Sequence, residues 1–156
     1  PEPLIQKEFS RIMSLKDGLK KMSKSEVSDL SRINLTDDKD QIVNKIKKAK
    51  TDALPLPTKI EELEKRPEAK NLIGIYSSLM NNTLQKTIDE FAGKNFSEFK
   101  EKLSEIVVNE INPISLKIKE LLDDKVFLEK ILKDGYEKAN EIASKKIKKI
   151  QEIVGF

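Results

Sequence analysis

The sequence contains no cysteine, no histidine and no tryptophan, and it has only 5 glycines among its 156 residues. Without cysteine, the chain forms no disulfide, offers no thiolate nucleophile and holds no cysteine-bound metal. Without histidine, it lacks the most common metal ligand and the usual acid–base group at neutral pH. These absences exclude a catalytic triad built on histidine and an ordinary zinc site.

Long apolar runs are also missing. No stretch approaches the roughly 18 apolar residues of a membrane-spanning helix, and no signal-peptide-like run opens the chain. We therefore expect a soluble, cytoplasmic protein without a membrane partner. The first residue is Pro1 rather than methionine, and the opening residues resemble mid-chain sequence, so we also expect a fragment of a longer protein.

The net charge is also small, because 30 Lys and Arg residues are nearly balanced by 27 Asp and Glu residues, which leaves +3. So small an excess excludes a uniformly basic nucleic-acid-binding protein, and any basic function must be local. Charged and hydrophobic residues each make up 37% of the chain. This composition is typical of a helical protein rich in Lys, Glu, Leu and Ile.

Apolar patterning divides the chain near Thr36. Before it, two short segments of alternating apolar residues, 11–15 and 31–35, predict short strands that flank a loop. From Thr36 onward, apolar residues recur at helical spacing, and proline or glycine residues separate the successive helices. The sequence thus predicts an all-α fold, a helical bundle preceded by a short loop and strand segment.

Local signals predict where the helices begin. Thr36 or Asp37 is expected to cap the first helix, and Thr58 with Glu61 has the spacing of a capping box. Pro67 suits the first turn of the following helix.

The last helix is expected from about residue 124 to residue 154, with an apolar face of its own. The residues expected to face the core of the preceding helices are Ile42, Val43, Ile46, Ala49, Leu72, Ile73, Tyr76, Leu79, Met80, Leu84, Ile88, Phe91, Phe99, Leu103, Ile106, Val107, Ile111, Ile114, Ile118, Leu121 and Leu122.

One motif carries chemistry. Residues 21–25 read Lys-Met-Ser-Lys-Ser, and we call them the signature loop. The ammonium groups of Lys21 and Lys24 can reach opposite sides of one polyphosphate, while the two serine hydroxyls add hydrogen bonds. The alternative is a solvated lysine-rich loop without a ligand, which is the usual meaning of such a run. A chance match to these five residues at this composition is on the order of one in two thousand, which favours the functional interpretation.

The five residues are the second signature of class I aminoacyl-tRNA synthetases, and their surroundings resemble bacterial tryptophanyl-tRNA synthetases. The resemblance runs in order over nearly the whole chain. Beyond the signature loop, it is carried by residues 11–15, Lys20, Ile33, Leu35, Ile42, Lys45, Ile46, residues 49–52, residues 71–73, Ile75, Tyr76, residues 99–108, Pro113, Ile114, Ile131, Leu132, Gly135, residues 138–140, Ala143 and Gly155.

The resemblance implies that the longer relatives activate tryptophan with ATP and magnesium, release pyrophosphate and charge tRNA(Trp), acting as homodimers. Lys24, and beside it Lys21, would be the catalytic residues that neutralise the pyrophosphate leaving group. ATP would be bound by both lysines with Met22, Ser23 and Ser25, Met22 lying near the adenine through its backbone. Magnesium would be held mainly by the phosphates, with no metal ligand expected in this chain.

The same resemblance implies a division into domains. Residues 1–35 would be a remnant of a Rossmann-type catalytic domain, and residues 36–156 a helical domain of the anticodon-binding type. The final helix, 124–154, would pack back on the catalytic domain. The family's first, HIGH-type signature and the tryptophan pocket do not occur in this sequence, so we expect this piece alone to be inactive.

Near the signature loop, the sequence departs from the many relatives that have Asp-Pro before and after it. Here Gly18 follows Asp17, and Glu26 with Val27 follows the loop. Gly18 is expected to loosen the approach to the loop, and neither change is expected to abolish phosphate binding.

RNA contacts are harder to place, and no tRNA-binding residue is identified. Two lysine clusters could meet phosphates or could simply solubilise helix surfaces. A different class of function also stays open, a stand-alone helical RNA- or protein-binding module in which the motif is accidental. Such a module would tolerate Lys24→Ala. The clusters are Lys45, Lys47, Lys48 and Lys50, and Lys145, Lys146, Lys148 and Lys149.

Overall fold

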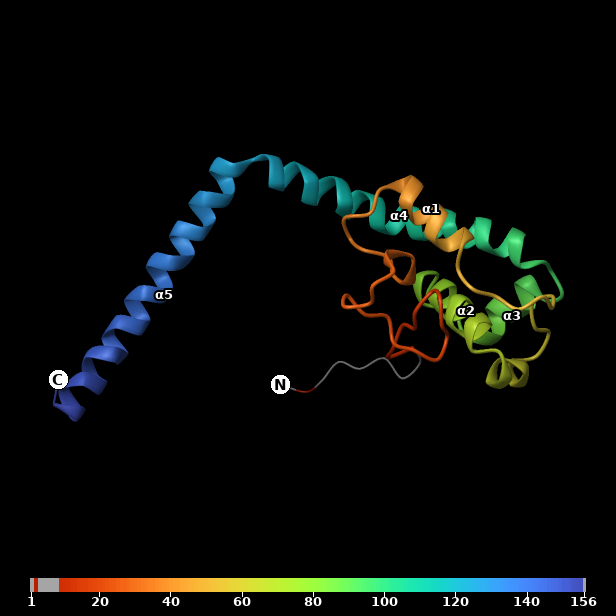
Figure 1. The fold of residues 1–156 in the computed structure, drawn as a ribbon, viewed down its shortest axis with the longest axis horizontal. Coiled ribbons are helices and arrows are strands. Elements are labelled where there is room, and N and C mark those ends of the chain that lie inside the picture. The colour runs from red at the N-terminus through yellow and green to blue at the C-terminus, as the bar shows by residue number, and fades with distance from the viewer. Residues whose placement is uncertain (1, 3–8, 156) are drawn as a thin grey trace. The chain divides into compact units, whose positions relative to one another are not determined.

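The computed structural model describes residue 2 and residues 9–155, so Pro1, Pro3 and Leu4 of the opening segment lie outside the described residues (Figure 1). The prediction of an all-α fold is confirmed. The helical elements, in chain order, are the 3₁₀ helix η1 (Asp29–Ser31), α1 (Lys39–Lys47), the 3₁₀ helix η2 (Ile60–Lys65), α2 (Pro67–Leu79), α3 (Leu84–Phe91), α4 (Phe96–Asp123) and α5 (Lys125–Val154).

The two predicted strands do not form. In the described part of the chain, the only bridge of sheet type is an isolated antiparallel one between Met13 and Lys21. The Met13 backbone pairs with the Asn71 side chain instead of a neighbouring strand. The second segment begins with Ser31, the last residue of η1, whose carbonyl accepts a hydrogen bond from the Leu15 N–H at 2.9 Å. The two segments therefore meet, but as loops rather than as a ladder.

The chain divides into two compact units, residues 1–115 and residues 116–156. The first unit holds the core, and the second consists of the end of α4 and the whole of α5. The division expected from the resemblance, between residues 35 and 36, concerns the longer relatives and stays a prediction.

Capping sets the helix starts, one or two residues away from where the sequence placed them. Asp38, rather than Thr36 or Asp37, caps α1 and forms a reciprocal capping box with Gln41. At η2, the carboxylate that accepts from the Thr58 N–H and hydroxyl belongs to Glu62 and not to Glu61. The start of α2 at Pro67 is confirmed.

An aromatic cluster forms the centre of the first unit. The Phe91 ring packs edge-on against the rings of Tyr76 and Phe99, each with its centroid 5.0 Å away. Many residues predicted to face the core are buried, but Leu79 and Met80 lie at the exposed end of α2, and Ile114 and Leu122 of α4 are exposed too. The buried apolar residues are Leu15, Ile42, Ile46, Ala49, Leu56, Leu63, Ala69, Leu72, Ile73, Tyr76, Ile88, Phe91, Phe96, Phe99, Leu103, Val107 and Val108.

A buried lysine joins α4 to the end of α1. The Lys100 ammonium donates to the carbonyl oxygens of Lys47 at 3.2 Å and Ala49 at 2.7 Å. Burial lowers the pKa of Lys100. The two hydrogen bonds from the ammonium satisfy carbonyl groups at the C-terminal end of α1, where the helix dipole favours a cation.

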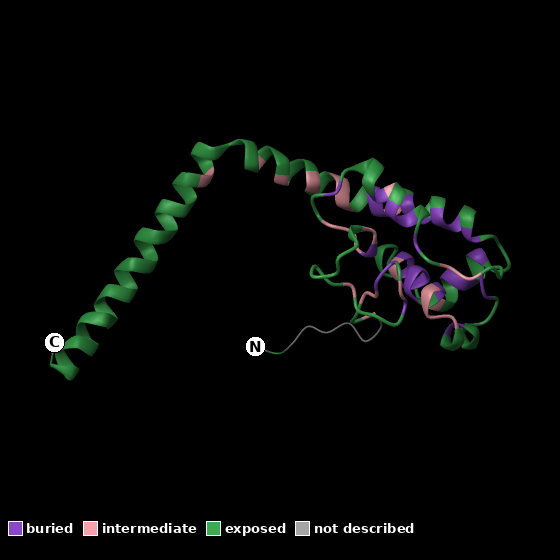
Figure 2. Cartoon of the chain, viewed as in Figure 1, coloured by how far each residue is buried: buried purple, intermediate pink, exposed green. Residues whose placement is uncertain are grey.

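Helix α5 confirms the expected last helix in its limits but has no buried residue (Figure 2). Asp124 caps it by accepting from the Phe127 N–H, and Gly155 ends it in the left-handed conformation with φ of 85°. Among the described residues, no helix is long and apolar enough to cross a membrane.

Candidate phosphate-binding site

The signature loop lies on the surface of the first unit. Lys21, Ser23, Lys24 and Ser25 are exposed, whereas Met22 is half-buried and packs against the core. The two serine hydroxyls share a hydrogen bond of 2.9 Å, and the Ser25 N–H donates to Ser23 Oγ at 3.3 Å. Met22 therefore fixes the loop to the core, while its lysines and serines face solvent.

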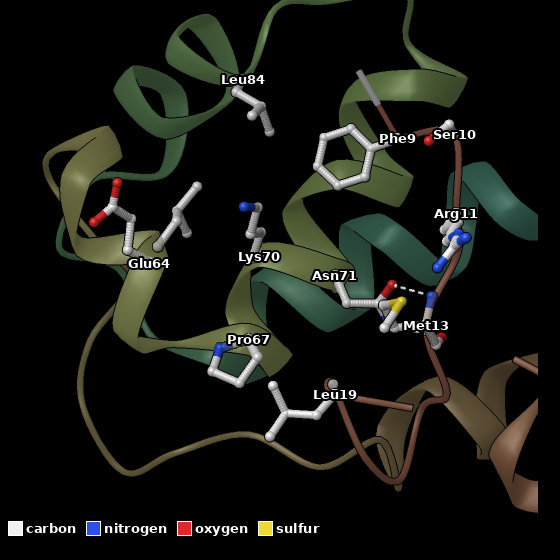
Figure 3. A pocket seen from close by; sticks show the side chains of 12 residues that line it. Phe9, Ser10, Arg11, Met13, Leu19, Glu64, Pro67, Lys70, Asn71 and Leu84 are labelled. Atoms are coloured by element: carbon white, nitrogen blue, oxygen red, sulfur yellow. Dashed lines mark hydrogen bonds between the residues drawn. The ribbon is translucent and has the colours of Figure 1, made fainter. Parts of the chain in front are cut away.

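The N-terminal root of the loop is held by backbone pairing and by one side chain of α2. The Met22 N–H donates to the Ile12 carbonyl at 3.0 Å, next to the bridge between Met13 and Lys21. Asn71 Oδ1 accepts from the Met13 N–H at 2.9 Å, and its Nδ2 donates to the Met13 carbonyl at 2.8 Å (Figure 3). Because the amide uses both of its functions on one residue, it fixes that residue in position as a strand neighbour would.

Gly18 also belongs to this root, and the expectation that it loosens the approach to the loop is wrong. A Cβ at Gly18 would lie 2.5 Å from the Pro67 carbonyl carbon and 2.6 Å from the Glu68 nitrogen. The absence of a side chain therefore lets the segment approach the start of α2 closely. The hydrogen bond from Lys50 is the main cause that lowers the pKa of Glu68, and the Gly18 backbone contributes.

The C-terminal root of the loop is held by polar side chains. Arg32 Nη1 donates to the Glu26 carbonyl at 2.9 Å, and its Nη2 lies 3.0 Å from Asp29 Oδ1. Asn34 donates to both Asp29 and Asp37. The chain is thus bound again directly after the loop, although Val27 between these contacts is 98% exposed.

Lys45 completes this root from α1. Its ammonium lies 2.6 Å from Asp37 Oδ2 and 2.6 Å from Asp29 Oδ2, and its side chain is only 4% exposed. The hydrogen bond from Lys45 is the main cause that lowers the pKa of Asp29, followed by that from Asn34. The interpretation of Lys45 as part of a phosphate-contacting cluster is therefore wrong. Of its neighbours, Lys47 and Lys48 are exposed, and Lys50 pairs with Glu68.

Two hollows lie beside these roots. A cavity of about 470 Å³ is lined by Met22, Ser23 and Lys24 on one side and by residues 32–36 on the other. A second, of about 560 Å³, lies between the segment before the loop and α2, where Phe9, Leu19 and Leu84 line it with Asn71 (Figure 3). The first hollow brings the signature loop and the segment after η1 to one concave surface.

The arrangement suits a polyphosphate. Within residues 9–155, the ammonium groups of Lys21 and Lys24 form no ion pair, so both are available to an anion. Exposed hydroxyls and loop N–H groups stand beside them. Mobile ammonium groups suit a phosphate chain whose charge shifts during reaction.

The profile of a protein family described as tRNA synthetases class I (W and Y) matches residues 1–112 of this chain. The chain belongs to this family. This match, together with the individual relatives, confirms the predicted resemblance to tryptophanyl-tRNA synthetases, and the matched portion of the relatives is their C-terminal one.

Individual relatives agree with the family assignment. Tryptophan–tRNA ligase of Agrobacterium fabrum is 51% identical over 155 residues, which are 99% of this chain and 44% of that protein. That of Rickettsia felis is 51% identical over 156 residues, which are 100% of this chain and 47% of that protein. The chain thus spans somewhat less than half the length of these curated relatives.

Solved structures show the same fold. The crystal structure of tryptophanyl-tRNA synthetase from Mycoplasma pneumoniae superposes with a TM-score of 0.71 at 26% identity, covering 97% of this chain and 45% of that one. The enzyme from Campylobacter jejuni gives the same TM-score and identity over 94% of this chain and 44% of that one.

Sequence reasoning found the signature loop but missed the residues that hold it. Arg32, Asn34 and Asn71 are single polar residues without a motif of their own, so no sequence signal marks them as anchors. Lys45 did carry a signal. It follows Ile42 by three residues and precedes Ala49 by four, which places it on the buried face of α1.

Proposed function

We propose that this chain is the C-terminal part of a tryptophan–tRNA ligase, an enzyme that activates tryptophan with ATP and then charges tRNA(Trp). The observation that carries the proposal is the exposed signature loop, anchored at both roots, in a chain 51% identical to tryptophan–tRNA ligases over nearly its whole length. The loop is the part of the chain that would meet ATP.

The mechanism at the loop is electrostatic. When the tryptophan carboxylate attacks the α-phosphate, the bond to the departing pyrophosphate breaks and negative charge builds on that group. Lys24 and Lys21 would neutralise this charge more strongly in the transition state than in bound ATP, which accelerates the step. Ser23 and Ser25 would donate hydrogen bonds to phosphate oxygens or maintain the loop conformation, and the Met22 backbone would lie by the adenine.

Magnesium would belong to the substrate, as the counter-ion of ATP. The signature loop offers cationic and hydroxyl groups, which suit phosphate oxygens and not a bare cation. The ion would therefore arrive with ATP, held by its phosphates. The remaining proposed properties of the longer protein, binding of tRNA(Trp), dimerisation and a cytoplasmic location, rest on the family.

The first experiment tests the function itself. Tryptophan-dependent exchange of pyrophosphate into ATP is measured on the full-length protein that contains this chain and on residues 1–156 alone. We expect exchange by the full-length protein and none by the piece, because two lysines and two hydroxyls do not position both substrates. An inactive full-length protein would refute the proposal. Exchange by the piece would refute the expectation that residues 1–156 need the rest of the protein for activity.

The second experiment tests the residue roles. In the full-length protein, Lys24→Ala should lower the rate of adenylate formation by about 100-fold and leave the affinity for tryptophan unchanged, since the ammonium acts on charge that develops only in the transition state. Lys86→Ala, which removes an exposed lysine of α3, is the matched control and should change neither. Full activity of Lys24→Ala, or equal losses of rate and of affinity for tryptophan, would refute the leaving-group role of Lys24.

A further inference from the structure

We propose that Lys45 is a positioning residue for the signature loop, acting through Asp29 and Arg32 at the loop's C-terminal root. The contacts that run from Lys45 through Asp29 and Arg32 to the Glu26 carbonyl form what we call the tether, and they rest on geometry alone. Only the catalytic consequence of the tether rests on the proposed function. Nothing in the signature itself points to α1 as its support.

The tether begins in the interior. The Lys45 ammonium is almost fully buried, and a buried charge is costly unless it is paired and hydrogen-bonded. Asp37, itself 5% exposed, is one partner at 2.6 Å. Because Asp37 also accepts from the Asn34 N–H at 2.8 Å, its position is fixed by the turn that precedes α1. Lys45 is thereby held in one place.

The second partner carries this fixed position outward. Asp29 is 55% exposed and belongs to η1, the first element after the signature loop. Because solvent can hydrate an exposed carboxylate, Asp29 does not require a buried partner. Its Oδ2 nevertheless lies 2.6 Å from the Lys45 ammonium, and its Oδ1 accepts from Asn34 and pairs with Arg32. Both oxygens are therefore used to fix the start of η1.

The last step reaches the residue directly after the loop. Arg32 pairs with Asp29 at 3.0 Å and donates to the Glu26 carbonyl at 2.9 Å. Glu26 follows Ser25 directly. A continuous set of charged hydrogen bonds thus runs from the interior of the first unit to the end of the signature loop, and Lys45 is its buried end.

This arrangement has a consequence for the proposed reaction. Lys24 lies between a fixed N-terminal root and this C-terminal root, so the volume that its ammonium explores depends on both. A catalytic group displaced by about 1 Å loses up to about 100-fold in rate. Loss of the tether should therefore act on the pyrophosphate step and not on the binding of tryptophan.

The test uses the full-length protein and a double variant that spares the fold. Lys45→Met with Asp37→Asn removes the buried ammonium and the buried carboxylate together, so no unpaired charge stays inside. The amide oxygen introduced by Asp37→Asn can still accept from the Asn34 N–H. Asp29→Asn is a second variant, at an exposed position where folding is not at risk. The control, Lys94→Met with Glu98→Gln, removes an exposed ion pair at the start of α4 with the same change of charge.

Two readouts are compared. The first is the rate of tryptic cleavage after Lys24, followed by mass spectrometry under native conditions, which reports loop freedom without reference to activity. The second is kcat for adenylate formation per titrated active site, with the KM for tryptophan. We expect both tether variants to be cleaved about 10-fold faster and to lose about 10-fold in kcat with KM unchanged, while the control resembles the unmodified protein. In a Lys24→Ala background, the same variants should cause no further loss, because Lys45 acts through Lys24.

Each other result counts against the inference. If cleavage after Lys24 and kcat equal those of the control, Lys45 is a structural residue only. If losses of kcat add fully to that of Lys24→Ala, Lys45 acts by another route. If the unmodified full-length protein shows no tryptophan-dependent exchange, the proposed function fails, and the cleavage rates alone decide whether the tether exists.

Discussion

The two units of this chain use the same sequence pattern and obtain opposite results. In residues 39–115, apolar residues at helical spacing are buried, and three aromatic rings meet at the centre. In α5, an equally regular stripe leaves no residue buried. Helical spacing therefore specifies a helix and its apolar face, but a separate surface has to supply the burial. The exposed residues of that stripe include Phe127, Ile131, Ile142, Ile147, Ile150 and Ile153.

The expectation that α5 packs on a catalytic domain stays a prediction. An exposed apolar stripe of this length is uncommon on a monomeric soluble protein, so we interpret it as the face that would meet that domain. The comparison between the units is open to direct test, because the chain offers matched residues in each.

Phenylalanine gives the largest expected contrast. Phe99 is fully buried against Tyr76 and Phe91, so Phe99→Ala should lower the free energy of unfolding by about 3–5 kcal/mol. Phe127 is 43% exposed in α5, and Phe127→Ala should cost less than about 1 kcal/mol. Urea unfolding of the chain measures both. Equal losses would show that α5 has a buried partner within this chain.

Tyrosine gives the next contrast. Burial, together with the hydrogen bond to Glu90, raises the pKa of Tyr76 to about 12 from 10.0. The unfolded chain then ionises first as pH rises, so the stability that Tyr76 contributes is complete below pH 10.0 and is lost toward about pH 12. The loss amounts to about 2 kcal/mol. The free energy of unfolding, measured by urea titration at several pH values in this range, should fall by this amount.

Tyr76→Phe should flatten that alkaline fall, because the phenyl ring has no proton to lose. The matched variant Tyr136→Phe, at an exposed position of α5, should leave the fall in place. A fall that survives Tyr76→Phe would assign it to other groups.

Glycine gives a contrast of sign. At Gly18, a methyl group would meet the backbone of α2 at 2.5 Å, so Gly18→Ala should destabilise the first unit by about 1–3 kcal/mol. At Gly135, inside α5, a methyl group would meet nothing within 4 Å, so Gly135→Ala should stabilise the helix by about 1 kcal/mol. Circular dichroism during thermal unfolding measures both. Two changes of the same sign would contradict the placement of Gly18 against α2.

Serine gives the smallest contrast. Ser77 Oγ, buried in α2, donates to the Ile73 carbonyl at 2.8 Å and lies 2.8 Å from the Thr87 hydroxyl, so Ser77→Ala should cost about 1 kcal/mol. Ser144 Oγ in α5 reaches only exposed Asn140, and Ser144→Ala should change stability by less than about 0.5 kcal/mol. The midpoints of urea unfolding, compared between variants whose unfolding curves have the same slope with urea, measure both changes in stability.

The sequence predicted local features well because their causes are local. Pro67 begins a helix because its ring suits the first turn, and α5 spans the limits expected from its apolar spacing. The strand predicted at residues 11–15 does not form, because the Met13 backbone is bonded to the Asn71 side chain, 58 residues away. The same reason applies at the site, where the signature loop was evident but its support by Arg32 and Lys45 depends on tertiary contacts.

The hydrogen bonds from Lys100 to the end of α1 also bear on how the chain folds. Helix α1 has only 9 residues, too few to persist alone in water. Its last carbonyl groups are satisfied by a side chain 53 residues further along. The helix therefore gains its closing contact only when α4 docks, and its formation is coupled to a distant event. Amide protons of α1 should consequently exchange with solvent through cooperative opening of the first unit, rather than by fraying of a short helix from its end.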